Sequence, residues 1–334
     1  MSGTSTIRRL RKPSAAFLAP QMAKKTPASY FLPSLFCVRV WTQDIEVDSG
    51  RSKSRPGPWM STSSSESSSG RYSMPEQPRG VIRALATPET VDMMLRSNWG
   101  PPTAGVYVLK SKVNEWMTLA WVEDLASGST QNLIRTSDAW IHRLTIRNHR
   151  TDGRVLLIGE YEARENTVNA LNALPVGVTI PASPAAPADQ RVYPVMRAEF
   201  TSDPGGTPVK LLYTELDITL DQRLSGEWTF SDKWDVWKRG KTLVTVDLKG
   251  MLSYETWTLL DAARAGTKGR FLFSATAPAL APLSASTFSI DIKSMDFEVD
   301  EIGHDATNGW VTFSASGRAL IDSSSGDFLT ITKT

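Results

Sequence analysis

Asp217-Ile218-Thr219-Leu220-Asp221 alternates strictly between polar and apolar residues. Earlier in the chain, Asp44-Ile45-Glu46-Val47-Asp48 repeats the same alternation. Strict alternation is typical of a β-strand with one packed face and one wet face. The two stretches therefore predict two similar half-wet sheets within one chain.

A second shared feature is a strand that leads into a short helix. The first helix begins after Thr87 and the second after Ser253, and each of these residues offers a hydroxyl for N-capping. Apolar residues then recur at helical spacing. We expect the helices to end near Gly100 and Gly266, because glycine is favoured just beyond a helix C-terminus.

The third shared feature is a hairpin that closes each half. Asp152-Gly153 separates two β-rich stretches in the first half, and Asn308-Gly309 does so in the second. Both dipeptides favour tight hairpin turns. The apolar positions change parity after Phe288–Ile292, which predicts a β-bulge near Lys293-Ser294.

These repeats predict a mainly β chain with two tandem copies of one sandwich or barrel fold, each with one short α-helix. A stretch rich in Pro and Ala separates the copies, and a Ser-rich loop interrupts the first. The expected segments are a basic N-terminal arm (1–28), copy 1 (29–172, with its Ser-rich loop 49–78), a linker (173–190), copy 2 (191–322) and a C-terminal tail (323–334).

The composition argues against several functional classes. The chain of 334 residues has 37 Lys and Arg against 35 Asp and Glu, which is no polyanion-binding signature. No apolar run is long enough for a membrane-spanning helix. The region from Met1 to Lys25 is basic and has no acidic residue. It reads either as a solvated tail or as an arm that docks on a neighbour or meets nucleic acid.

The sequence offers no recognisable catalytic, metal or cofactor site. It has three histidines, His142, His149 and His304, and one cysteine, Cys37. None of them belongs to a zinc, nucleophile-elbow or phosphate-loop pattern. We therefore expect a protein that is not an enzyme and that needs no cofactor.

Several passages of the second half resemble the tail tube proteins of long-tailed phages. They are Tyr213–Asp221, which looks like the family's first inner strand, Gly240–Gly250, Ser253–Gly266, and the closing pair Phe288–Ile292 and Gly309–Gly317. The first half shows the same parts more loosely. The resemblance implies a duplicated tail-tube-type β-sandwich or barrel.

The resemblance also implies a function. Such a chain would form rings, trimeric but pseudo-hexameric because of the duplication, and the rings would stack into the hollow tail tube that conducts DNA during ejection. Its partners would be other copies of itself, the tape measure protein and phage DNA in the lumen, and the tail terminator and distal tail proteins at the tube ends. It would belong to the virion, assemble in the host cytoplasm and involve no membrane.

Two sets of residues carry this expectation. The wet strand positions should face the lumen, where acids and hydroxyls would not retain DNA; they are Asp44, Glu46, Asp48, Glu160, Glu162, Asp217, Thr219, Asp221, Thr312, Ser314 and Ser316. Large aromatics in the long loops should contact the next ring; they are Trp59, Trp228, Trp234 and Trp237.

Two alternatives stay open. One is another tail component of related fold, such as a distal tail or connector protein. The other is a secreted double β-sandwich that binds carbohydrate in an aromatic groove, although the N-terminus lacks the apolar stretch of a signal peptide.

Overall fold

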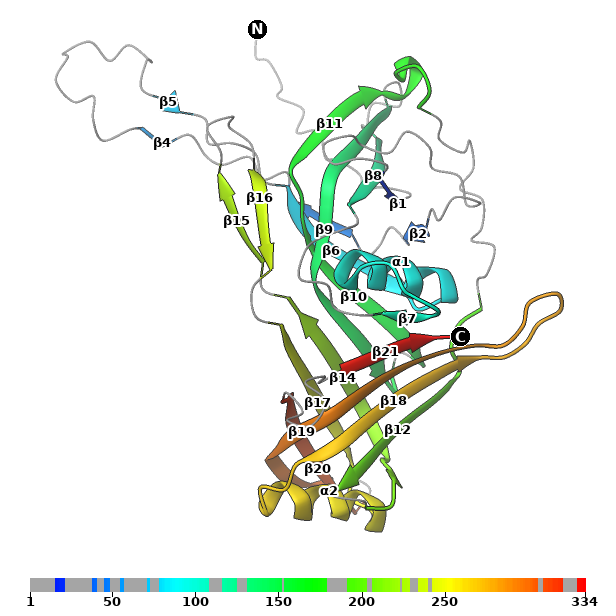
Figure 1. Ribbon diagram of the computed structural model, residues 1–334, viewed down its shortest axis with the longest axis vertical. Helices are drawn as coiled ribbons and strands as arrows, with labels where there is room; N and C mark the ends of the chain where they lie inside the picture. The colour runs from blue at the N-terminus through cyan, green and yellow to red at the C-terminus, as the bar shows by residue number, and fades with distance from the viewer. Residues whose placement is uncertain are drawn as a thin grey trace, which may run out of the picture.

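The computed structural model describes residues 16–21, 38–40, 45–48, 55–56, 71–72, 78–107, 116–124, 131–151, 153–178, 191–202, 206–222, 224–228, 234–239, 242–305, 309–320 and 329–334 (Figure 1). The chain is mainly β with two short α-helices, and every strand pairing in the described part is antiparallel. Asp44 and Trp59 lie outside the described residues.

The first half contains β1 to β11 and α1. Their bounds are β1 (Ala16–Pro20), β2 (Val38–Val40), β3 (Ile45–Asp48), β4 (Arg55–Pro56), β5 (Arg71–Tyr72), β6 (Arg79–Leu85), α1 (Pro88–Trp99), β7 (Val106–Tyr107), β8 (Met117–Asp124), β9 (Gln131–His149), β10 (Arg154–Glu162) and β11 (Glu165–Ala170), followed by a 3-10 turn (Leu171–Ala173). The strands pair in the orders β3-β6-β10-β9 and β1-β8-β9-β11, so β9 belongs to both sets.

The second half contains β12 to β21 and α2. Their bounds are β12 (Val195–Ser202), β13 (Val209–Lys210), β14 (Tyr213–Asp221), β15 (Leu224–Trp228), β16 (Trp234–Arg239), β17 (Leu243–Met251), α2 (Tyr254–Arg264), β18 (Gly269–Ala277), β19 (Ser286–Asp305), β20 (Trp310–Ala319) and β21 (Leu329–Lys333). The strands pair in the orders β14-β17-β20-β19 and β12-β18-β19-β21.

Among the described strands, two pairs join the halves. β9 pairs with β14, with Glu215 opposite His149 and Asp221 opposite Arg143. The C-terminal strand β21 pairs with β7, with Ile331 opposite Tyr107. The first of these pairs makes one long sheet in the order β3-β6-β10-β9-β14-β17-β20-β19, which is called the long sheet below.

The helices form where the capping residues predict. The Thr87 hydroxyl accepts a hydrogen bond from the Thr90 amide at 3.2 Å, and Pro88 occupies the first turn. The Ser253 hydroxyl accepts from the Thr256 amide, also at 3.2 Å, within a capping box. α1 packs on β9 and α2 on β19, so each helix covers one long strand.

Both long strands bend at a bulge. The partners of β18 change from Ile292 opposite Phe271 to Met295 opposite Gly269, so β19 carries one extra residue at Lys293 or Ser294. This confirms the bulge predicted from the parity change, and it keeps the apolar side chains on both sides of the bend in the core. β9 has a similar bulge, where Asp138 has a φ of 50°.

The core is one connected hydrophobic cluster that spans both halves. Its largest fully buried side chains include Trp99, Trp121, Phe273 and Phe288. Apolar residues at alternate positions of the long sheet join it, as the strict alternation predicts for a sheet with one packed face. The opposite face of the long sheet is mostly polar on β9, β14, β17, β20 and β19, whereas β10 places Leu156 and Ile158 there, opposite Arg147 and Thr145 of β9.

Two strands lie in segments expected to be peripheral. β1 falls within the expected N-terminal arm and pairs with β8, and β21 falls within the expected C-terminal tail and pairs with β19 and β7. Both strands are short and have a partner on each side, so they are stabilised by strands that are distant in sequence.

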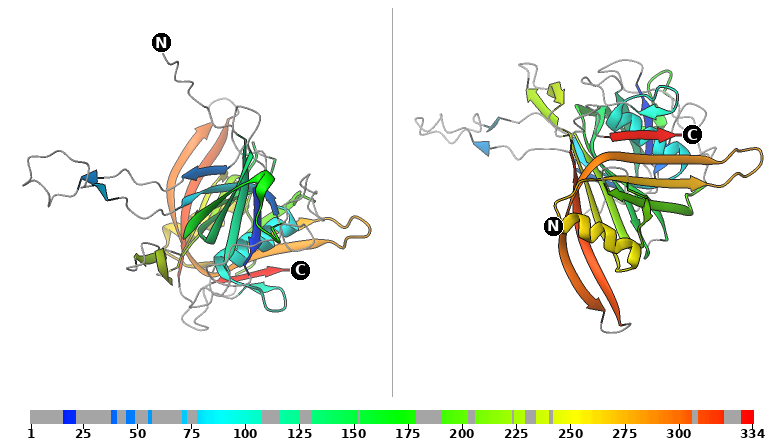
Figure 2. Two further views of the ribbon diagram at one scale, coloured as in Figure 1. Left: turned by 90° about the horizontal axis from the view of Figure 1, so that it is seen from above. Right: turned by 60° about the horizontal axis from the view of Figure 1, so that its bottom comes forward.

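The β19–β20 pair extends beyond helix α2. In Figure 2 (right) the pair is orange and the helix is yellow.

Candidate functional site

One face of the long sheet collects most of the residues expected to line a lumen. The register places Arg147 opposite Asp217, Asp217 opposite Asp247, Asp247 opposite Ser316 and Ser316 opposite Glu298, so these side chains form one row across β9, β14, β17, β20 and β19. We call the side that carries this row the outer face. The predicted residues on it are Glu160, Glu162, Asp217, Thr219, Asp221, Thr312, Ser314 and Ser316.

These outer-face residues are mostly half-buried, with neighbouring side chains of the same face around them. Thr219 is the most enclosed, at 8% exposed, and its hydroxyl lies 3.1 Å from that of Thr145. The residues that alternate with these outer-face residues along β14, such as Ile218 and Leu220, belong to the core. The face is therefore distinct from the core, and its place in a lumen stays a prediction.

The other predicted residues are placed only by backbone or not at all. Glu46 and Asp48 lie in β3, opposite Val81 and Arg79 of β6. The backbones of Trp228, Trp234 and Trp237 belong to the β15–β16 hairpin, where Trp228 is opposite Trp234 and Trp237 is opposite Gly226. Their role at an inter-ring contact stays a prediction.

The junction between β9 and β14 is held by complementary side chains as well as by backbone pairing. The Arg147 guanidinium donates to both carboxylate oxygens of Asp217, at 3.1 and 3.0 Å, and His149 Nε2 lies 3.1 Å from the same carboxylate. The Asn148 amide donates to the Tyr213 hydroxyl at 2.7 Å. Bidentate Arg–carboxylate pairs fix geometry as well as charge, so this junction has a defined register.

The far end of the outer face is acidic. β19 exposes Asp296, Glu298, Asp300 and Glu301, and Asp300 accepts a hydrogen bond from the Ser316 hydroxyl at 3.0 Å. Burial raises the pKa of Asp247, and the negative charges of Asp217 and Asp300 raise it further, while Arg143 lowers it. Negative charge therefore accumulates from β17 to β19.

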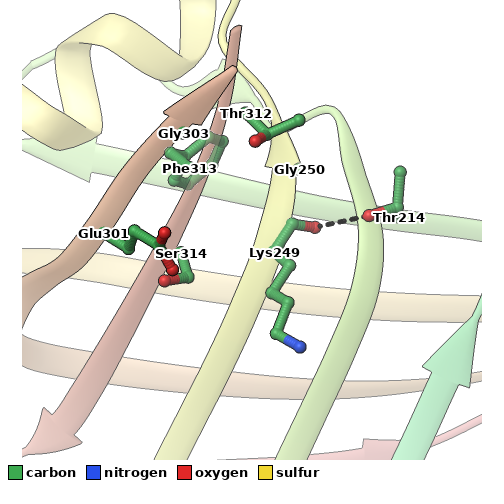
Figure 3. A pocket seen from close by; sticks show the side chains of 8 residues that line it. All are labelled: Thr214, Lys249, Gly250, Glu301, Gly303, Thr312, Phe313 and Ser314. Atoms are coloured by element: carbon green, nitrogen blue, oxygen red, sulfur yellow. Dashed lines mark hydrogen bonds between the residues drawn. The ribbon is translucent and has the colours of Figure 1, made fainter. Parts of the chain in front are cut away.

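A shallow pocket of about 320 Å³ opens at the same end, between β14, β17, β20 and β19 (Figure 3). Its lining residues are Thr214, Lys249, Gly250, Glu301, Gly303, Thr312, Phe313 and Ser314. Lys249 pairs with Glu215 at 3.0 Å, and this hydrogen-bonded carboxylate raises the pKa of the Lys249 ammonium. The lining combines one base, one acid and hydroxyls, without an arrangement of nucleophile and general base.

Metal-binding clusters and membrane-spanning helices are both absent from the part of the chain that the structure describes. No group of three or more His, Cys, Asp or Glu residues there is arranged to hold a metal ion. Within the same residues, no helix has both the length and the apolar character needed to cross a membrane.

Exposed aromatic residues were not all identified from the sequence. Trp257 on α2 is 41% exposed, and the Arg264 guanidinium lies over its ring, 5.3 Å from the ring centroid. Trp310 at the start of β20 is 55% exposed. Ile302, on the strand paired with β20, is 40% exposed. Trp310 directly follows the Asn-Gly turn, and this position at the end of a hairpin could have predicted its exposure.

No protein-family model matches the chain, and no curated protein matches it significantly.

Proposed function

We propose that this chain is a structural virion protein, a duplicated tail tube subunit that oligomerises into rings and stacks into the hollow tail tube of a long-tailed phage. The observation that carries the proposal is the long sheet. It contains two four-stranded sets, β3-β6-β10-β9 and β14-β17-β20-β19, joined edge to edge.

The strand pairings support a tandem duplication. In the first half the pairs are β1–β8, β8–β9, β9–β11, β9–β10, β10–β6 and β6–β3. Replacing each strand by its counterpart gives β12–β18, β18–β19, β19–β21, β19–β20, β20–β17 and β17–β14 in the second half. A helix follows β6 and β17 alike, and a small hairpin follows β3 and β14 alike.

Local details support the same correspondence. Where β9 bends, the Arg164 amide donates to the Ser137 carbonyl at 3.0 Å, and where β19 bends, the Leu320 amide donates to the Ser294 carbonyl at 2.8 Å. Each half also has a glycine that faces a large apolar side chain of its long strand: Gly159 on β10 faces Ile141 of β9, and Gly317 on β20 faces Phe297 of β19. Such agreement in hydrogen bonding and packing is hard to obtain from two unrelated folds.

The edges of the long sheet suggest how chains would associate. Among the described strands, none pairs with the outer edge of β3 or with the outer edge of β19 beyond Met295. The corresponding edges inside the chain, those of β14 and β9, pair with each other. Repeating that pairing between chains is a head-to-tail contact, and rotation closes such contacts into a ring without exposed edges.

In such a ring, three chains supply six similar folds and one continuous barrel. The outer face would line the lumen, where its acids and hydroxyls would meet the tape measure protein during assembly and DNA during ejection. The β15–β16 hairpin and its counterpart would reach the next ring, and terminator and distal tail proteins would cap the two ends.

Negative-stain imaging of the purified full chain tests the proposal, with mass measurement by light scattering. Rings or tubes with a central hole and a trimeric repeat are the expected result. Single rings that never stack would favour the distal tail or connector alternative. A chain that remains monomeric under all conditions and binds carbohydrate would refute the proposal.

A further inference from the structure

The junction inside the chain joins opposite charges. From Trp140 to His149, β9 carries Arg143 and Arg147 and no acid, while β14 carries Glu215, Asp217 and Asp221 and no base. The register sets Arg143 opposite Asp221 and Arg147 opposite Asp217, and the second pair is bidentate. Opposite charges directly across a strand pair stabilise it.

The counterpart of β9 has the opposite charge. From Met295 to Asp305, β19 carries no Lys or Arg and five acids, among them the exposed Asp296, Glu298, Asp300 and Glu301. Glu298 lies at the end of the outer-face row, beyond Asp247 and Ser316. The nearest bases along the rows, Arg318 opposite Asp296 and Lys249 opposite Ser314, lie on the inner strands β20 and β17 and not at the edge.

The strand at the other end of the long sheet, β3, is also acidic in sequence. β3 reads Ile45-Glu46-Val47-Asp48, with two acids and no base in the strand. A chain-to-chain junction built like β9–β14 would therefore set an acidic strand beside an acidic strand. Like charges across a strand pair are destabilising, and their repulsion is felt over the screening length of the solution.

We propose that the junction between chains is gated by cations: the like-charged edges of β19 and β3 keep the free chain monomeric, and cations that screen or bridge their carboxylates permit the two edges to pair. This inference rests on the proposed function and specifies how assembly is controlled. It reverses the usual effect of salt, because a junction such as β9–β14 weakens when its charges are screened, whereas the junction between chains strengthens.

The experiment measures the oligomeric state of the full chain against salt, by light scattering and negative-stain imaging. In NaCl, assembly is expected to begin near about 0.1 M, where the screening length falls to about 10 Å, and to increase toward about 1 M, where it is about 3 Å. MgCl2 at matched ionic strength separates screening from bridging, because only bridging makes Mg²⁺ more effective than Na⁺.

The variant Glu298→Arg gives β19 the kind of charge that β9 carries. It should assemble at salt concentrations below the wild-type midpoint. The control Asp261→Arg changes the net charge equally at an exposed position of α2, outside both edge strands, and should keep the wild-type midpoint. Far-UV circular dichroism verifies that both variants fold.

The outcomes separate the two claims. Rings that form equally well at low and high salt would overturn the gating and leave the proposed function intact. A control that shifts the midpoint as much as Glu298→Arg would also overturn the gating, because bulk charge would then explain the effect. If neither the wild-type chain nor Glu298→Arg assembles at any salt concentration, the proposed function fails and the gating fails with it.

Discussion

The substitution Gly317→Ala tests how the bent strand β19 packs on β20. A Cβ built on Gly317 would lie 2.6 and 2.8 Å from Cε1 and Cδ1 of the Phe297 ring, and 2.9 Å from the Met295 sulfur. Nonbonded carbons are comfortable at about 3.5–4.0 Å, so the ring would have to move by roughly 1 Å. It has little room, because it packs edge-on against Phe200 at 5.7 Å and against Phe271 at 6.1 Å.

Overpacking of this kind costs about 1–3 kcal/mol, and the reduced freedom of the unfolded chain returns about 0.4–1 kcal/mol. We therefore expect Gly317→Ala to lower the free energy of unfolding in urea by about 1–2 kcal/mol. The matched control is Gly303→Ala on β19, where the new Cβ would meet only the Thr312 hydroxyl at 3.2 Å and the Glu301 carboxylate at 3.9 Å. It should change stability by no more than about 0.5 kcal/mol.

A double-mutant cycle identifies the cause. Phe297→Leu removes the ring atoms that would clash, so the loss caused by Gly317→Ala should largely disappear in that background. The expected coupling free energy is about 0.5–3 kcal/mol. Equal stability of Gly317→Ala and the control, or strict additivity of the two substitutions, would refute the packing argument.

Three further predictions concern single interactions. Asp217→Ala removes the partner of Arg147 at the β9–β14 junction and should cost about 1 kcal/mol in urea unfolding, a modest value because the pair is partly exposed; an unchanged midpoint would contradict it. Ser253→Ala removes the cap of α2 and should cost about 1 kcal/mol, whereas Ser253→Thr should retain most of the stability. Burial would raise the pKa of Asp291, but hydrogen bonds from Arg270 and Lys293 outweigh it and lower the pKa. These hydrogen bonds therefore stabilise the fold above the ordinary carboxyl pKa of about 4, and their contribution is lost as the pH falls through the lowered pKa. Arg270→Ala should reduce this loss of stability at acid pH, measured as the melting temperature against pH.

The features that the sequence predicted are those that depend on near neighbours. Thr87 and Ser253 cap helices because a hydroxyl can reach an amide three residues away, whatever the rest of the chain does. Gly153 and Gly309 take φ values of 63° and 70° next to the hairpin turns, which glycine tolerates at no steric cost. The bulge near Lys293 was also visible, since burial on both sides of a bend requires a change in parity.

The strands that the sequence missed depend on distant partners. β21 carries two apolar residues, Leu329 and Ile331, and is ordered between β19 and β7, which lie far from it in sequence. β7 contributes Tyr107, whose hydroxyl bonds to Asp92 on α1, and burial together with that carboxylate raises the pKa of the phenol. No local periodicity reports such contacts, because a short strand gains its stability from whatever flanks it.

The long sheet shows the same division. Alternation along β14 and β17 predicts which residues enter the core, because it reports one buried face, but it does not say which strand lies beside which. The information that joins β9 to β14 was present as charge: Arg143 and Arg147 on one strand match Asp221 and Asp217 on the other at the same spacing and in antiparallel order. Comparing the charges along each predicted strand, and not only its alternation of polar and apolar residues, would have predicted that β9 pairs with β14.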